Sequence, residues 1–218
     1  MLVNGELKDN LNDFDLAEDQ IIVIDDLFPQ WMIDHIHNQV FNTYSWFYGH
    51  TSNYPEDPMY DVGADASWAE VPAFKQQINP PTSPNAHDSC WQMVYNAITQ
   101  FIPFELELGE VLVNGQQHIH NTVPHTDCEC DNGLTFIYYP NREWKEEWGG
   151  ATLVELESGI WTPIYPKPGR VAIFKGNIPH HGLPPNEDYK GLRAFLARSL
   201  ALLQATPPIL LSWGGFSL

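Results

Sequence analysis

From residue 105 onward the chain consists of short apolar runs separated by turn-forming residues, and this cadence restricts the fold more than any other feature. The runs are, in order, GEVLVNG, TVPHTD, GLTFIYYP, ATLVEL, IWTPIYP, RVAIF, IPHHGL and RAFLARSLALL. Bounded runs of this kind read as β-strands. Seven or eight of them predict a closed or two-sheet antiparallel β architecture with helices packed outside it.

The first part of the chain predicts one strand and two helices. An acidic opening segment precedes the apolar run QIIVIDDLF, which starts at Gln20 and suits a strand. Pro29 can begin a helix, and Asp88 can cap a second one. The apolar stripe of the first helix would consist of Trp31, Ile33, Ile36, Val40 and Phe41. That of the second would consist of Trp91, Val94, Tyr95, Ile98 and Phe101.

Residues 49–87 are expected to form a long irregular segment on the surface. They contain Pro55, Pro58, Pro72, Pro80, Pro81 and Pro84 among many polar residues. Loops of this length in compact domains are often functional. The segment is therefore either a lid over a substrate or plain surface decoration.

A single domain is expected for the 218 residues, because 43% of them are hydrophobic and no repeat or linker divides the chain. Its expected parts are an N-terminal strand, helices and long loop over 1–104, a core over 105–200 and a C-terminal tail over 201–218.

The net charge of −18 argues against nucleic acid as a partner, since affinity for a phosphate backbone depends on Lys and Arg. No apolar stretch is long enough to span a bilayer, and the first residues lack the pattern of a signal peptide. Three cysteines are too few for a disulfide framework. These features predict a cytoplasmic protein without a membrane partner.

His125, Asp127 and His180 form the strongest candidate for chemistry. Residues two apart in a strand point to the same side, so the H-x-D unit directs an imidazole and a carboxylate into one space. The stretch GRVAIFKGNIPHHGL can bring a second histidine there from a distant strand. Two histidines and one carboxylate form the metal site of non-haem Fe(II) oxygenases. The alternative is that His125 and Asp127 merely hydrogen-bond at a strand end.

Arg193 and the Tyr138-Tyr139 pair are candidates for binding an anion. A guanidinium inside a β-barrel is costly unless an anion accompanies it, and its planar donors match a carboxylate. The distal carboxylate of 2-oxoglutarate fits this requirement, and a phenol hydroxyl can be a second donor to it. Strand alternation predicts that Arg193 points inward and Arg198 outward, whereas the alternative places both arginines on the surface.

The ordered motifs resemble the Fe(II)- and 2-oxoglutarate-dependent oxygenase superfamily, in its prolyl 4-hydroxylase-like group. HTDCECDNGLTFIYYPNREWKEEWGGATLVE is similar to the segment with H-x-D, I-Y-Y-x-N and a Gly-Gly turn. PKPGRVAIFKGNIPHHGLPPNEDYKGLRAFLA is similar to the closing half, with P-G-R, P-H and G-x-R. The resemblance covers roughly residues 105–200.

The resemblance implies a double-stranded β-helix (jelly-roll, cupin-like) core with flanking helices. It makes His125, Asp127 and His180 the catalytic iron ligands, and it assigns Arg193 and Tyr139 to the cosubstrate carboxylate. The implied cofactors are Fe(II), 2-oxoglutarate as cosubstrate and O2, with ascorbate as an optional addition.

Several neighbouring residues keep alternative roles. His181 is the alternative to His180, and adjacent residues of an extended segment point apart, so only one should face the iron. Gln116, His118 and His120 line either the cosubstrate pocket or the surface. Trp144 and Trp148 form either the floor of a substrate groove or a hydrophobic edge. Cys128 and Cys130 could build a zinc site with His118, His120 and His125, although C-x-C lacks the usual spacing.

The expected activity is hydroxylation of a substrate C–H bond with release of succinate and CO2. The resemblance favours a protein or peptide side chain as substrate, prolyl first. The alternatives are an oxygenase that acts on a free amino acid or another small molecule, and a non-catalytic metal-binding β-barrel module.

Overall fold

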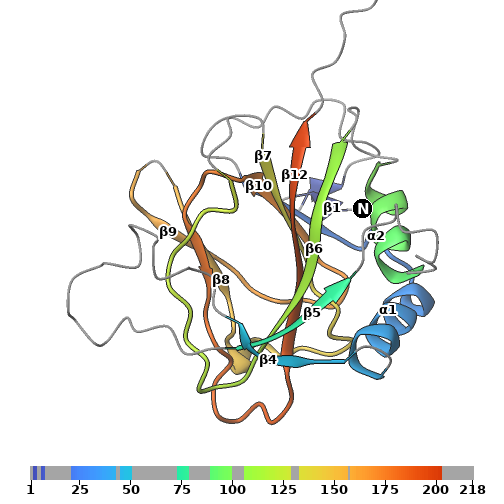
Figure 1. Ribbon diagram of the computed structural model, residues 1–218, viewed down its shortest axis with the longest axis vertical. Helices are drawn as coiled ribbons and strands as arrows, with labels where there is room; N and C mark the ends of the chain where they lie inside the picture. The colour runs from blue at the N-terminus through green and yellow to red at the C-terminus, as the bar shows by residue number, and fades with distance from the viewer. Residues whose placement is uncertain are drawn as a thin grey trace, which may run out of the picture.

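Two antiparallel β-sheets with two helices on one side form the architecture of the computed structural model (Figure 1). The structure describes residues 2–3, 6–7, 21–42, 45–50, 73–78, 89–99, 106–128, 133–156 and 158–202. The chain is thus mainly β with flanking helices, as expected, and its core is a double-stranded β-helix.

The large sheet has nine strands in the order β2-β1-β3-β10-β7-β12-β6-β5-β4. Their bounds are β1 Leu2–Val3, β2 Glu6–Leu7, β3 Ile22–Asp25, β4 Phe47–His50, β5 Ala73–Ile78, β6 Leu106–Gln116, β7 Gly133–Tyr138, β10 Val171–Lys175 and β12 Arg193–Leu202. The small sheet has the order β11-β8-β9, with β8 Thr152–Glu155, β9 Trp161–Ile164 and β11 His180–Gly182. A 3-10 turn, Glu146–Trp148, precedes β8.

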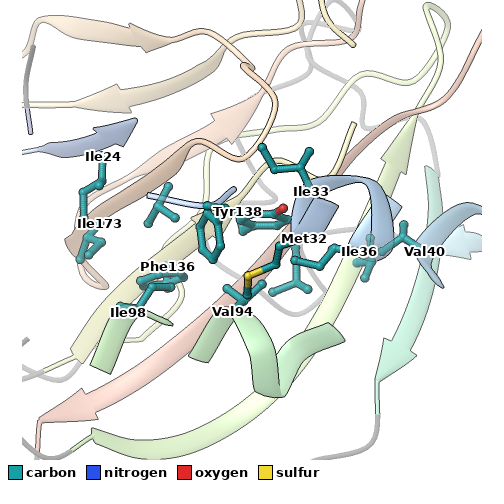
Figure 2. Packing of buried hydrophobic residues seen from close by; sticks show 14 of the residues in the cluster. Ile24, Met32, Ile33, Ile36, Val40, Val94, Ile98, Phe136, Tyr138 and Ile173 are labelled. Atoms are coloured by element: carbon teal, nitrogen blue, oxygen red, sulfur yellow. The ribbon is translucent and has the colours of Figure 1, made fainter. Parts of the chain in front are cut away.

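The helices α1 (Gln30–Asn42) and α2 (Ser89–Thr99) cover one face of the large sheet. Figure 2 shows apolar side chains of both helices packed against Phe136 and Tyr138 of β7. Met32, Ile33, Ile36 and Val40 are the buried residues of α1. Trp31 was expected in this stripe but is 65% exposed. The buried residues of α1 follow one another at spacings of three and four, and Trp31 does not fall on that stripe.

The opposite face of the large sheet lies against the small sheet. Alternate side chains of β7 point to opposite faces of the large sheet. Leu134, Phe136 and Tyr138 belong to the apolar cluster beneath the helices, and Ile137 and Tyr139 belong to the cluster between the two sheets. β12 divides in the same way, with Ala194 and Leu196 beneath the helices. The face between the sheets carries the polar residues of interest.

The expectation of an irregular segment over 49–87 is wrong in part. β4 ends at His50, and β5 (Ala73–Ile78) pairs with β6 at the edge of the large sheet. The sequence of β5, AFKQQI, contains no proline, as expected of a strand that pairs within a sheet. Residues 51–72 and 79–88, to which the lid interpretation applied, lie outside the described residues.

The expected N-terminal part and the expected core are joined in one sheet. β3, β4 and β5 share a sheet with the later strands, and β12 continues to Leu202. The run TVPHTD is not a strand but touches β11 through one isolated bridge, His125 with His180. Within the described part of the chain, no helix is long and apolar enough to span a membrane.

Candidate metal centre

His125, Asp127 and His180 meet at one end of the space between the sheets. Their potential ligand atoms all lie within 4.8 Å of one another. Nε2 of His125 is 3.9 Å from Oδ1 of Asp127, and Nε2 of His180 is 3.7 Å from the same oxygen. Both distances are too long for a hydrogen bond. They leave a position that all three side chains face.

Backbone pairing brings the two histidines together although they are far apart in the sequence. The amide of His125 donates to the carbonyl of His180 at 3.0 Å, and the reverse bond is 2.9 Å. The imidazole centroids are 4.6 Å apart. The amides of Asp127 and Cys128 both donate to the carbonyl of Gly176, which fixes the loop that carries the carboxylate.

Hydrogen bonds orient each of the three side chains. Nδ1 of His125 lies 3.2 Å from the Val123 carbonyl, and Nδ1 of His180 lies 3.0 Å from the Ile178 carbonyl. A carbonyl can only accept, so Nδ1 carries the proton and the lone pair of Nε2 faces the centre. The hydroxyl of Thr135 donates to Oδ2 of Asp127 at 2.6 Å, which leaves Oδ1 toward the histidines.

This donor set fits a divalent transition metal ion. Ligand atoms that bind one ion at about 2.1 Å lie at most about 4.2 Å apart, and both His–Asp distances meet this limit. Two imidazoles and one carboxylate match the set that binds non-haem Fe(II) with positions left open. The side chains of His125 and Asp127 are each 20% exposed, so the centre is reached from solvent.

Arg193 lies farther inside the same space and is completely buried. Its Nε donates to the Gly150 carbonyl at 2.6 Å, Nη1 to Oε1 of Gln116 at 2.6 Å, and Nη2 to Oγ1 of Thr152 at 2.9 Å. A guanidinium has five donors. These bonds use one donor on each nitrogen, and the Tyr139 hydroxyl is a further hydrogen-bonding neighbour of the guanidinium.

The positive charge of Arg193 has no carboxylate partner among the described residues. Burial lowers the pKa of Arg193 to about 10, while the nearby Tyr139 raises it. The side chain is therefore still cationic at neutral pH. Its Cζ lies 4.6 Å from the centroid of the Phe195 ring, a cation–π contact that offsets part of the lost hydration. A buried, uncompensated cation favours binding of an anion.

Tyr139 points into this space, whereas Tyr138 packs beneath the helices against Phe28. The Tyr139 hydroxyl lies 2.8 Å from Oγ1 of Thr152, so both Tyr139 and Arg193 contact this threonine. The Tyr139 ring centroid is 5.8 Å from Cζ of Arg193. Burial raises the pKa of Tyr139 above its usual value, so the hydroxyl remains protonated and can donate.

His181 is buried but faces away from the metal position. Its Nδ1 lies 3.2 Å from the Thr122 carbonyl, and its ring meets Trp161 edge to face at 5.3 Å. Burial lowers the pKa of His181, which keeps the imidazole neutral. The structure thus brings His180, and not its neighbour, to His125 and Asp127.

The residues before the metal loop take different positions. Gln116 is buried beside Arg193, His118 is exposed, and His120 is buried against Phe74 with Nδ1 accepting from the Gln117 amide. The zinc set expected as an alternative does not assemble among the described residues, where the one candidate metal group is that of His125, Asp127 and His180. Cys130 lies outside them.

Trp144 and Trp148 form an aromatic cluster with Tyr189. The ring centroids of Trp144 and Trp148 are 5.6 Å apart, and each lies 4.7 Å from that of Tyr189. Nε1 of Trp144 donates to the Gly149 carbonyl and so ties the cluster to the Gly149-Gly150 turn. This arrangement favours a hydrophobic edge. The side chain of Arg198 lies outside the described residues.

Sequence reasoning missed two of the polar residues that orient the site side chains and left a third open. Thr135 and Thr152 were expected only as strand residues, and Gln116 was placed either at the cosubstrate pocket or at the surface. A period-2 reading of β7 would have placed Thr135 on the same face as Tyr139. Gln116 could not be found in this way, because its role depends on the pairing of β6 with β12, which places it opposite Arg193.

Comparison with known proteins agrees with this geometry. The family model described as "2OG-Fe(II) oxygenase superfamily" matches residues 111–197, a range that contains all three metal-facing residues and Arg193. A search of curated proteins finds no match.

Solved structures share the fold at low sequence identity. A Pseudomonas putida prolyl-4-hydroxylase is 17% identical with a TM-score of 0.54, over 87% of this chain and 96% of that chain. A Trichoplax adhaerens prolyl hydroxylase, solved with a hypoxia-inducible-factor peptide fragment, is 13% identical with a TM-score of 0.54, over 85% and 84%.

A 2OG-Fe(II) oxygenase family oxidoreductase from Burkholderia pseudomallei is 10% identical with a TM-score of 0.57, over 83% and 85%. The family match over 111–197 agrees with the expected resemblance to the Fe(II)- and 2-oxoglutarate-dependent oxygenase superfamily, and the solved structures, two of them prolyl hydroxylases, show that the fold is shared.

Proposed function

We propose that this protein is an Fe(II)- and 2-oxoglutarate-dependent dioxygenase that hydroxylates a C–H bond of its substrate. In this proposal His125, Asp127 and His180 hold the iron, and Arg193 with Tyr139 binds the C5 carboxylate of 2-oxoglutarate. Succinate and CO2 are released with each turnover. O2 is the proposed oxidant, and ascorbate is an optional addition.

The observation that carries the proposal is the pairing of a buried cation with a metal-facing triad in one space. After its contacts with Gly150, Gln116 and Thr152, Arg193 has two further N–H donors, one of which can reach the Tyr139 hydroxyl. A guanidinium N–H and the phenol O–H can together donate to the two oxygens of a carboxylate. A dicarboxylic 2-oxo acid can bind the metal and neutralise the buried cation at the same time, with its keto acid end at the metal and its other carboxylate at Arg193.

Bound iron would supply the activation of O2 for oxidative decarboxylation and C–H oxidation. The protein's own residues do the remaining work. Nδ1–H bonds to Val123 and Ile178 keep Nε2 of His125 and His180 available, and Thr135 turns the carboxylate of Asp127. Arg193 orients the cosubstrate, and the buried strands around it exclude water from the cosubstrate's far end.

We further propose a protein or peptide side chain as substrate, prolyl first. The support is the fold shared with prolyl hydroxylases, one of which was solved with a peptide fragment. The net charge of −18 would favour a basic or neutral polypeptide over an acidic one. A free amino acid or another small molecule is the competing substrate class.

Anaerobic addition of Fe(II) and 2-oxoglutarate tests the proposed cofactors. We expect a weak visible charge-transfer absorption that needs both components. Folded protein without this absorption would contradict the proposal and favour a non-catalytic metal-binding module.

The substrate class is tested by mass spectrometry of proteins and metabolites from cells that express the protein. We expect peptides that gain one oxygen atom on proline in an iron-dependent way. Oxygen gained only by small metabolites would replace the peptide proposal.

A further inference from the structure

Gln116 connects the arginine to the strand that carries a metal-facing histidine. It is 1% exposed and ends β6, where it is paired with Arg193 of β12. Its Oε1 accepts from Nη1 of Arg193 at 2.6 Å, and its Nε2 donates to the Gly182 carbonyl at 3.1 Å. Gly182 lies two residues after His180 in β11.

The packing around Gly182 restricts how far the Gln116–Arg193 pair can move relative to β11. A Cβ on Gly182 would lie 2.9 Å from Oε1 of Gln116 and 3.2 Å from Nη1 of Arg193, so β11 approaches the pair as closely as a glycine permits. Thr122 also donates to the Gly182 carbonyl, at 2.8 Å. The position of the guanidinium is thereby fixed relative to the strand of His180.

The neutrality of Gln116 is as important as its position. A carboxamide accepts one hydrogen bond from Arg193 and donates one to Gly182, whereas a carboxylate could only accept. A carboxylate would also cancel the charge that an incoming anion needs. Glutamine therefore holds the guanidinium in place and leaves its positive charge available to a ligand.

We propose that Gln116 is a positioning residue that sets both the charge offered by Arg193 and its distance from the metal centre, and so selects 2-oxo acids by their distal carboxylate and chain length. This inference rests on the proposed function. Gln116 acts through Arg193 and need not touch the reacting atoms.

The test compares three 2-oxo acids on Mn(II)-loaded protein by calorimetry. They are 2-oxoglutarate, 2-oxoadipate, which is one methylene longer, and 2-oxobutyrate, which lacks the distal carboxylate. In Gln116→Glu we expect 2-oxoglutarate affinity to fall about 10- to 150-fold, the range for loss of a charge-assisted contact. Affinities for Mn(II) and 2-oxobutyrate should stay unchanged, since neither involves the guanidinium.

Gln116→Met keeps the length of the side chain and removes both hydrogen bonds. We expect the preference for 2-oxoglutarate over 2-oxoadipate to shrink about 2- to 12-fold, because the guanidinium stays charged but is no longer held at one distance from the metal centre. The matched control is Gln117→Glu, which adds the same charge at the adjacent, partly exposed position. It should leave all three affinities unchanged.

Three results would overturn the inference. Unchanged 2-oxoglutarate affinity in Gln116→Glu would remove the charge argument, and an unchanged chain-length preference in Gln116→Met would remove the positioning argument. Equal losses for all three acids would indicate a merely structural residue. If the Mn(II)-loaded wild-type protein does not bind 2-oxoglutarate at all, the proposed function itself fails, which separates that failure from the failure of this inference.

Discussion

The metal end and the arginine end of the site differ in how they meet water. At the metal end, the side chains of His125 and Asp127 are each 20% exposed, and a carboxylate is available for a cation. At the arginine end, the guanidinium is fully buried and carries an unmatched positive charge. The first end is accessible to a metal ion from solvent, whereas the second offers a fixed, dehydrated charge to an anion.

This difference indicates that the two ends bind their ligands by different interactions. Electrostatic interactions are weak near water and strong where water is excluded. The metal end therefore depends on direct coordination, and the arginine end depends on preorganised hydrogen bonds. Changes at one end should affect metal binding, and changes at the other should affect binding of the 2-oxo acid. Four substitutions test this separation.

Asp127→Ala should have the largest effect and break the metal end. Loss of the one carboxylate should weaken Mn(II) or Fe(II) binding by more than about 100-fold, since loss of a residue behind the ligands already costs 10- to 100-fold. Calorimetric metal titration measures this, with the exposed Asp188→Ala as control. Full iron-dependent turnover in Asp127→Ala would remove this carboxylate from the site.

Arg193→Ala should break the arginine end and leave the metal end intact. We expect the 2-oxoglutarate requirement to rise about 10- to 150-fold, which corresponds to roughly 1.5–3 kcal/mol for a charge-assisted contact. Metal affinity should not change, and the exposed Arg142→Ala is the control. An unchanged requirement would transfer the role to Arg198.

Thr135→Val should weaken the metal end without removing a ligand. The fully buried hydroxyl donates to Oδ2 of Asp127, and valine has the same shape without this donor. Metal affinity should fall about 10- to 100-fold. The affinities for 2-oxobutyrate and 2-oxoglutarate should fall by the same factor as the metal affinity and no further. Thr162→Val on β9 serves as control. Wild-type metal affinity would show that Asp127 needs no orienting partner.

Tyr139→Phe should have the smallest effect and sharpen the comparison at the arginine end. The phenol contacts Thr152, which also accepts from Arg193. Loss of one neutral hydrogen bond should raise the 2-oxoglutarate requirement about 2- to 12-fold, or roughly 0.5–1.5 kcal/mol. Metal titration should give wild-type values. A loss as large as that of Arg193→Ala would make Tyr139 an equal partner in anion binding.

The strands and helices were largely predictable, because their buried apolar residues stand in runs bounded by turn-forming residues. The turns that separate the apolar runs placed β7, β8, β9, β10 and β12 within a few residues of their observed bounds. β5 escaped detection because AFKQQI has weak alternation and stands between prolines. Its strand state depends on pairing with β6, a long-range interaction that local sequence does not report.

The site was predictable only where chemistry marks a residue in the sequence. Histidine, aspartate and an arginine in an apolar strand stand out, and period-2 alternation places Arg193 and Phe195 together on the inner face. Thr152 does not stand out, and the sequence left Gln116 between the cosubstrate pocket and the surface. Their importance arises from which strands become neighbours, and that is decided by the pairing of whole sheets.

The paired backbone hydrogen bonds between His125 and His180 bear on whether the chain tolerates circular permutation. These bonds join the two ligand segments directly, so we expect the ligand pair to form even when the chain between them is cut. The turn at 158–160 is exposed and lies in that interval. Opening the chain at Gly159 and joining the original termini through a linker should yield a circular permutant that still brings the two imidazoles together, because exposed turns tolerate such cuts.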